Sequence, residues 1–415
     1  MSVEWTPPPR PEWLSAFLAE SRSMDVPSMV SLDADELIAT AVRHTGLTDF
    51  GPDDWREPFA LLTRSLKEEA DLHLWGRLMT RTELLNGLEQ RLQIEAAFTA
   101  HPEINDEVID RPIIIVGLPR SGTSILHEIL AQDERLMAPS SWELLYPAPP
   151  PEAASYRSDP RIERAHHLFT QYARVAPTFA AMHEMGAWVP NECAVAFKIA
   201  FRSGHTAGLS YIPTYANWLF AADLTPAYRY YRRILQLLQW RNPRMRWLLK
   251  SPDHQPYLPT LFNVFPDAQV VLTHRDPLRA QASATNMIGT LYWMRSDRRF
   301  DAAGFESLLD PRFTAQRLNQ MIDWIEQGVL PRQQLIDMHY SDLMTDPKGS
   351  VQALYDRLGI EWSTQARHAA ERHLQSKPKG KFGAHLYKTE ESNEVRAYFE
   401  RYQQYFSVQS EGGSE

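Results

Sequence analysis

The chain has 415 residues, with 43 basic and 52 acidic side chains and a formal net charge of −9. An acidic chain is a poor partner for nucleic acids and polyanions unless basic residues cluster locally, so we expect no nucleic-acid partner. Hydrophobic residues make up 43% of the sequence, which is enough to build a sizeable core in one or more globular domains.

The N-terminal part of the chain is predicted to form a helical extension. Residues 1–32 are proline-rich at their start, which favours irregular structure. From Asp33 to about Ala100, apolar residues such as Leu66 and Leu72 recur among charged ones, as in amphipathic helices. We therefore assign residues 1–105 to a helical N-terminal extension and residues 106–406 to a second region.

The pattern changes after Arg111, where short apolar runs alternate with helical stretches. Residues 112–117 (PIIIVG) are typical of a buried strand, and a helical stretch, 125–131, follows directly. Further strand candidates are residues 246–250, 269–274 and 334–340. Strands that alternate with helices predict an α/β fold with a central parallel sheet.

Helical segments interrupt and close this second region. Residues from about 151 to 245 are predicted to be helical, are rich in aromatic side chains, and form an insertion between strands. An amphipathic helix is expected over residues 392–406, and the tail 407–415 is expected to fray. The apolar face of that last helix comprises Val395, Tyr398, Phe399, Tyr402 and Phe406.

The most informative motif is residues 117–124 (GLPRSGTS), which lie between a predicted strand and a predicted helix. Gly117 and Gly122 have Walker A spacing, at which glycines let backbone N–H groups converge on an anion at a helix N-terminus. Thr123 replaces the Walker A lysine, and the cation is Arg120, inside the loop. No predicted strand ends in a Walker B aspartate, so the loop suits an anionic group held without an obligatory metal. Within the loop, the candidate hydroxyl donors to the anion are Ser121, Thr123 and Ser124. The alternative interpretation is a glycine turn that binds nothing.

A second anion site is predicted where the 269–274 strand ends. Arg275 follows this strand, at the edge where open α/β sheets bind ligands, and a guanidinium grips phosphate bidentately. If a helix starts near Pro277, Ser283 lies about two turns along it and faces back toward the strand end. The alternative for Arg275 is an ion pair with an acidic neighbour such as Asp276.

Together these motifs resemble those of the PAPS-dependent sulfotransferases, in particular the bacterial branch. Residues 119–123 (PRSGT) look like the family's 5′-phosphosulfate loop, and Arg275 with Ser283 looks like its 3′-phosphate site. Lys379 and Gly380 resemble the basic glycine motif that closes over the nucleotide, although the usual Arg-Lys-Gly reads Pro-Lys-Gly here. The resemblance covers about residues 110–406; the further matching segments, in family order, are 226–240, 247–254, 265–268 and 340–347.

The resemblance implies a P-loop-like sulfotransferase fold and an enzyme of EC 2.8.2 type. Such an enzyme moves a sulfuryl group from 3′-phosphoadenosine 5′-phosphosulfate (PAPS) to a hydroxyl, and no metal is expected. Arg120 and the loop amides would hold the 5′-phosphosulfate, and Lys250 would assist at the bridging or sulfuryl oxygens. The alternatives are a P-loop nucleotide kinase and a nucleotide-binding relative without catalysis. The resemblance assigns the 3′-phosphate to Arg275, Ser283, Lys379 and Gly380.

His254 is predicted to be the catalytic base. An acceptor hydroxyl must lose its proton as it attacks sulfur, and a histidine is the usual general base near neutral pH. In the cytosolic sulfotransferases the catalytic histidine follows a strand-end lysine and a hydroxyl residue. Here Pro252 and Asp253 separate His254 from Lys250 and Ser251. The alternative is a histidine that caps a helix or lies on the surface.

The aromatic-rich segment 200–220 is expected to line an acceptor pocket, or else to pack as helix core. Aromatic residues and negative charge favour a neutral hydrophobic small molecule or lipid as the acceptor. Cys193 is the single cysteine, so no internal disulfide can form and a reducing, cytoplasmic location is expected. We find neither a signal peptide nor an apolar stretch long enough to span a bilayer. The oligomeric state does not follow from the sequence.

Overall fold

The computed structural model describes residues 5–182, 184–243, 245–376 and 393–411, and within them the fold is α/β with a five-stranded parallel sheet at its centre. The spatial order of the strands is β2-β3-β1-β4-β5, and each neighbouring pair is parallel. Strand order reverses at the central β1, which is where an open α/β sheet forms a crevice for ligands. The strands are β1 (Ile113–Gly117), β2 (Leu136–Met137), β3 (Arg246–Lys250), β4 (Gln269–His274) and β5 (Leu335–His339).

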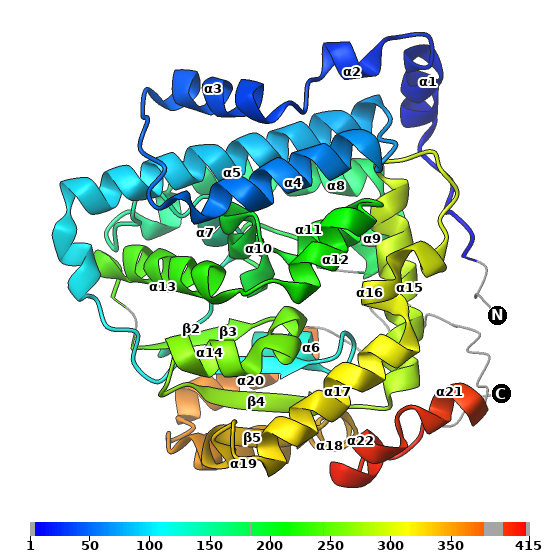
Figure 1. Cartoon of the computed structure of the whole chain (residues 1–415). Helices are drawn as coiled ribbons and strands as arrows, with labels where there is room; N and C mark the ends of the chain where they lie inside the picture. The colour runs from blue at the N-terminus through cyan, green and yellow to red at the C-terminus, as the bar shows by residue number, and fades with distance from the viewer. Residues whose placement is uncertain (1–4, 183, 244, 377–392, 412–415) are drawn as a thin grey trace.

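Side chains of the strands alternate between two hydrophobic layers, one on each face of the sheet. Ile113 and Ile115 of β1 pack into one layer, and Ile114 and Val116 pack into the other. Because helices cover both faces, the strands read as continuous apolar runs in the sequence (Figure 1). Helices of the first layer are α6 (Thr123–Leu130), α19 (Pro347–Leu358) and α20 (Thr364–Ser376). Helices of the second layer are α13 (Thr225–Trp240), α14 (Leu258–Val264) and α17 (Pro311–Glu326).

The N-terminal helices form a further layer above the second face of the sheet (Figure 1). Trp55 and Leu88 of this layer belong to the same hydrophobic core as Ile114 of β1. The expectation of irregular structure over residues 1–32 is wrong in part, because two helices form there and Leu14 docks the first one against Phe179. The helices are α1 (Glu12–Ser21), α2 (Val26–Met29), α3 (Ala34–Thr45), α4 (Arg56–Glu68) and α5 (Leu74–Ala100).

The region between β2 and β3 is helical, as the sequence predicted. Helix α10 (Cys193–Phe197) packs against α13 and places Cys193 and Phe197 in the same hydrophobic core as Ile114 of β1. The remaining helices here are α7 (Ser141–Leu145), α8 (Pro160–Val175), α9 (Pro177–Met182), α11 (Gly204–Leu209) and α12 (Pro213–Ala221). Short 3₁₀ helices are η1 (Asp53–Trp55), η2 (Pro102–Asp106), η3 (Tyr156–Ser158), η4 (Lys198–Ala200), η5 (Pro252–Tyr257), η6 (Ala302–Phe305) and η7 (Arg332–Gln334).

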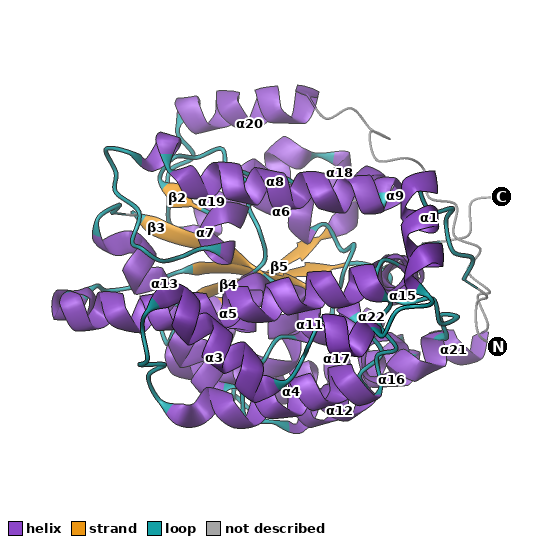
Figure 2. Cartoon of the chain, turned by 90° about the horizontal axis from the view of Figure 1, so that it is seen from above, coloured by secondary structure: helices purple, strands orange, loops and turns teal. Residues whose placement is uncertain are grey.

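The last part of the chain returns to the sheet, which helices enclose in the view from above (Figure 2). The amphipathic helix expected over 392–406 is two short helices, broken near Tyr398 and Phe399, although Phe399, Tyr402 and Phe406 are buried as expected. Among the described helices, none is both long and apolar enough to cross a membrane. The helices not yet named are α15 (Pro277–Trp293), α16 (Glu306–Leu309), α18 (Tyr340–Thr345), α21 (Asn393–Ala397) and α22 (Glu400–Tyr405).

Candidate active site

The carboxyl ends of the strands bring several predicted site residues to one edge of the sheet. Residues 117–124, named the phosphate loop here for their predicted role, begin at the end of β1. Lys250 ends β3, and Arg275 follows β4. The register aligns Ile115 with Lys250, and Gly117 with Thr273 of β4. Residues far apart in the chain therefore lie around the carboxyl end of β1.

The phosphate loop has a shape that its two glycines permit. A Cβ on Gly117 would lie 2.1 Å from Oγ1 of Thr273, so that the loop packs this closely on β4 only with glycine there. Gly122 has a φ of 92° and precedes α6 without any side-chain cap on the helix. Arg120 is also in the left-handed region, with a φ of 68°, and is exposed. The first N–H groups of α6 therefore face the loop uncapped, as an anion site requires.

The three hydroxyls of the loop differ in their surroundings. Ser121 is buried, and its Oγ lies 2.6 Å from both the Leu118 carbonyl oxygen and Oγ1 of Thr273. Its hydroxyl therefore ties the loop to β4 and is already engaged. Thr123 is buried at the first position of α6, whereas Ser124 is exposed.

Lys250 lies between the phosphate loop and the helical insertion. Its buried ammonium donates to Oε1 of Glu192 at 2.8 Å and to Oγ of Ser124 at 3.4 Å. Glu192 directly precedes α10, is partly exposed, and balances the charge of the buried Lys250 ammonium. Sequence reasoning missed Glu192, because nothing in its local pattern marks a residue that pairs with a lysine 58 positions away.

Arg275 joins the two predicted anion sites. Its Nη1 donates to the backbone oxygen of Arg120 at 2.9 Å, and its guanidinium stacks over the ring of Tyr340 at 4.0 Å. The C-terminal tail engages two further donors, since Nε and Nη2 lie 2.7 and 2.8 Å from the carboxylate oxygens of Glu411. The donors that would grip a phosphate therefore already hold a carboxylate.

Asp276, the alternative partner of Arg275, is engaged elsewhere. Its carboxylate caps α15 by accepting from the N–H of Leu278 at 3.1 Å. It also accepts from Arg396 at 3.2 Å and from the backbone N–H of Glu411 at 2.8 Å. Asp276 thus anchors the tail that Arg275 contacts.

Helix α15 begins at Pro277, as predicted, and Ser283 lies on a buried face of it. Lys379 and Gly380 lie outside the described residues. His274 points away from Arg275, as strand alternation predicted, because its ring nitrogens meet Tyr402 at 2.8 Å and Asp337 at 3.0 Å.

His254 is buried in η5 and does not cap a helix or lie on the surface. Its Nδ1 shares a hydrogen bond of 2.7 Å with the hydroxyl of Tyr228, and its ring packs edge-on against Phe197. Nε2 is buried without a hydrogen-bond partner among the described residues. Burial lowers the pKa of His254 to about 3, so that the imidazole is neutral at physiological pH.

Asp253, which sequence reasoning treated as part of an insertion, lines a cavity of about 120 Å³. Leu118 and Pro119 of the phosphate loop also line this cavity. The aromatic-rich segment contributes Leu219 and Phe220 to its wall, whereas Tyr215 of the same segment is fully buried in the core. The segment therefore supplies both a pocket wall and helix core.

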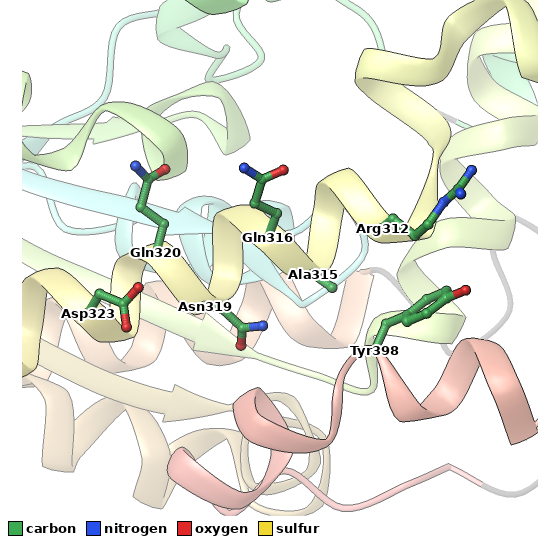
Figure 3. A pocket seen from close by; sticks show the side chains of 7 residues that line it. All are labelled: Arg312, Ala315, Gln316, Asn319, Gln320, Asp323 and Tyr398. Carbon is green, nitrogen blue, oxygen red and sulfur yellow. The ribbon is translucent and has the colours of Figure 1, made fainter.

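A larger hollow, of about 510 Å³, lies along α17 (Figure 3). Arg312 and Tyr398 stand at one end of it and Asp323 at the other (Figure 3). Its lining contains none of the predicted site residues. In the described ranges, no three His, Cys, Asp or Glu side chains gather into a candidate metal site.

Comparisons with known proteins agree on one family. The family model described as "Sulfotransferase family" matches residues 112–364. The crystal structure of sulfotransferase STF1 from Mycobacterium tuberculosis H37Rv is 31% identical, with a TM-score of 0.75 over 88% of this chain and 98% of that chain. Sulfotransferase STF9 from Mycobacterium avium is 27% identical, with a TM-score of 0.78 over 91% of this chain and 97% of that one.

A curated relative has a more specific name. Omega-hydroxy-beta-dihydromenaquinone-9 sulfotransferase Stf3 from Mycobacterium bovis is 25% identical over 268 residues, and the same values hold for Stf3 of M. tuberculosis. The match spans 61% of this chain and 64% of each relative. The chain therefore covers less than two thirds of the length of these curated relatives.

Proposed function

The chain belongs to the sulfotransferase family, and on that premise we propose that it transfers a sulfuryl group from PAPS to a hydroxyl of a hydrophobic small molecule or lipid. One observation supports PAPS as the sulfuryl donor: the two predicted anion sites are in contact, because Arg275 donates a hydrogen bond to the backbone oxygen of Arg120 at 2.9 Å. A nucleotide with an anionic group at both its 5′ and 3′ positions matches two adjoining sites. ATP would match the first site alone.

The residues present fit such a nucleotide. Gly117 and Gly122 place no side chain in the loop, and the uncapped start of α6 faces it. We assign the 5′-phosphosulfate to this cradle together with Arg120. We assign the 3′-phosphate to Arg275, Ser283, Lys379 and Gly380.

In the proposed reaction, the chain stabilises charge and holds groups in place. Arg120 and the α6 amides stabilise the negative charge that grows on the departing phosphate oxygen. The ammonium of Lys250 lies beside Ser124 of the loop, and Glu192 holds it there. We assign it to the bridging or sulfuryl oxygens of the donor. A base must still take the acceptor proton, and both His254 and Asp253 follow Lys250 in the chain.

A hydrophobic acceptor is supported by the cavity that begins at the phosphate loop. Its wall includes Phe197, Leu219, Phe220 and Leu224. The curated relative named above is, by its name, a sulfotransferase of a menaquinone derivative. We therefore propose an alcohol, phenol or lipid with an apolar body, and the cytoplasm as the location of the protein.

Nucleotide binding tests the donor assignment without knowledge of the acceptor. Adenosine 3′,5′-bisphosphate should raise the melting temperature without added metal, and ATP should raise it much less. Arg275→Ala should weaken bisphosphate binding by roughly 10- to 100-fold, the equivalent of about 1.5–3 kcal/mol for a charged hydrogen-bonded contact. Affinity for adenosine 5′-phosphosulfate should change far less.

Arg312→Ala is a matched control, because Arg312 is an exposed arginine that pairs with Asp310 and lines the hollow of Figure 3, which contains none of the predicted site residues. It should leave binding of both nucleotides unchanged. Equal stabilisation by ATP, or a strict requirement for Mg²⁺, would contradict the proposed donor. Labelled PAPS incubated with the protein and a lipid extract would then identify the acceptor.

A further inference from the structure

One oxygen of the Asp253 carboxylate lacks the hydrogen-bond partner that a buried polar atom normally has. Its Oδ2 has no hydrogen-bond partner among the described residues, and packs against Gly204, where a Cβ would lie 2.7 Å away. No ion pair within the described part of the chain includes it. The attraction of Arg317 reaches it, yet that guanidinium stacks over Phe220 at 4.3 Å instead. Oδ2 of Asp253 therefore has an unused capacity to bind a proton or to accept a hydrogen bond from a hydroxyl.

The position of Asp253 connects it to the donor site. It follows Lys250 by three residues, in the 3₁₀ helix that begins directly after β3. It lines the same cavity as Leu118 and Pro119 of the phosphate loop. A molecule in this cavity therefore touches both the loop and Asp253.

His254, the predicted base, is directed elsewhere. Its Nδ1 is engaged with Tyr228, its ring packs against Phe197, and it does not line the cavity. Protonation of its ring would place a charge in the core, as the lowered pKa of His254 reflects. These contacts suit a residue that holds η5 against α13.

We propose that Asp253, rather than His254, takes the proton of the acceptor hydroxyl, and that the hydroxyl binds where the cavity meets this carboxylate. The assignment rests on the sulfuryl transfer proposed above. As the acceptor oxygen bonds to sulfur, its proton passes to a carboxylate oxygen of Asp253. The bond from sulfur to the bridging phosphate oxygen breaks, and its electron pair stays on that oxygen.

The groups around Asp253 allow it to exchange a proton near neutral pH. Burial raises its pKa to about 7, and the negative charge of Glu192 on the neighbouring α10 segment adds to the rise. Arg317 on α17 and the backbone N–H groups of His205 and Gly204 at α11 act in the opposite sense. His205, Tyr228 and Tyr257 also lie near Asp253 and stay neutral near pH 7. Burial lowers the pKa of His205 to about 3, and it raises the pKa values of the Tyr228 and Tyr257 hydroxyls.

The test compares Asp253→Asn with His254→Asn. Consumption of labelled PAPS is measured with 1-dodecanol, with 2-naphthol, and with water as the sole acceptor. Asp253→Asn should slow transfer to 1-dodecanol by about 10²- to 10⁴-fold, the usual contribution of a general base. Transfer to 2-naphthol should fall less, because a phenol is already partly acidic.

The pH profile gives a readout that a structural role would not change. The wild type and His254→Asn should both lose activity as the pH falls below about 7, and this limb should be absent from Asp253→Asn. Asp323→Asn is the matched control, a carboxylate in the hollow of Figure 3, and should behave as the wild type. Affinity for adenosine 3′,5′-bisphosphate should be alike in all four proteins, and each should stay folded at the assay temperature, as a thermal melt checks.

Two results would overturn the assignment. One is an Asp253→Asn protein with near wild-type turnover and an unchanged pH profile. The other is a His254→Asn protein that alone loses 10²-fold or more with its nucleotide affinity intact, which would make His254 the base. Failure of the proposed function looks different, since the wild type would then not bind the bisphosphate or would consume no PAPS with any acceptor, including water.

Discussion

Removal of the Glu411 carboxylate is expected to strengthen the binding of nucleotides that carry a 3′-phosphate. Both carboxylate oxygens of Glu411 contact Arg275, at 2.7 and 2.8 Å. An incoming phosphate must displace them to use the same donors. In Glu411→Gln the backbone N–H of residue 411 keeps its bond to Asp276, so the tail stays attached and mainly the competing charge is lost.

The size of the effect follows from the exposure of the pair. The Arg275 and Glu411 side chains are 18% and 36% exposed, so that water screens their attraction. A bidentate pair in this setting stabilises the tail contact by about 1 kcal/mol. The dissociation constant for adenosine 3′,5′-bisphosphate should therefore fall by about fivefold in Glu411→Gln.

Isothermal titration calorimetry with two ligands measures this effect. Affinity for adenosine 5′-phosphate, which lacks the 3′-phosphate, should stay within about twofold of the wild type. Glu326→Gln is the control, because Glu326 is a carboxylate paired with Arg401 at 2.9 Å, away from the site. In an Arg275→Ala background, Glu411→Gln should have no effect. A gain that persists in that background, or no gain at all, would refute the reasoning.

Further predictions concern stability and reactivity. Burial raises the pKa of Asp253 from 3.8 to about 7, so the wild type should lose stability as the pH rises through this window. Between pH 5 and pH 8, the unfolding free energy of Asp253→Asn in urea should therefore gain about 2–3 kcal/mol relative to that of the wild type. Stability curves that run parallel in the two proteins would contradict this. Gly117→Ala would place a Cβ 2.1 Å from Thr273 Oγ1 and should lower unfolding free energy by about 1–3 kcal/mol; an unchanged melting temperature would show that the loop moves freely. Burial raises the pKa of the Cys193 thiol to about 12, so iodoacetamide at pH 8 should modify it by mass spectrometry only after denaturation; rapid labelling of the native protein would argue against this burial.

The sequence alone determined the strands and the phosphate loop, because their signals are local. Strands covered on both faces need continuous apolar runs, and residues 246–250 and 269–274 coincide with β3 and β4. The glycine spacing of residues 117–122 reflects a backbone shape that other residues strain, so the loop can be recognised from adjacent positions. β2 has two residues and carries too short a pattern to be recognised.

Contacts between distant segments were decided by the tertiary structure. Glu192 pairs with a lysine 58 positions away, and Glu411 with an arginine 136 positions away, and no local pattern encodes either distance. Which of His254 and Asp253 suits the role of base also depends on contacts with distant segments. Both residues follow β3 in adjacent positions, but packing joins the histidine to Tyr228, whereas Asp253 lines the cavity. Desolvation and the charges of surrounding elements then set which of the two can exchange a proton near neutral pH, and these arise only when the chain is folded.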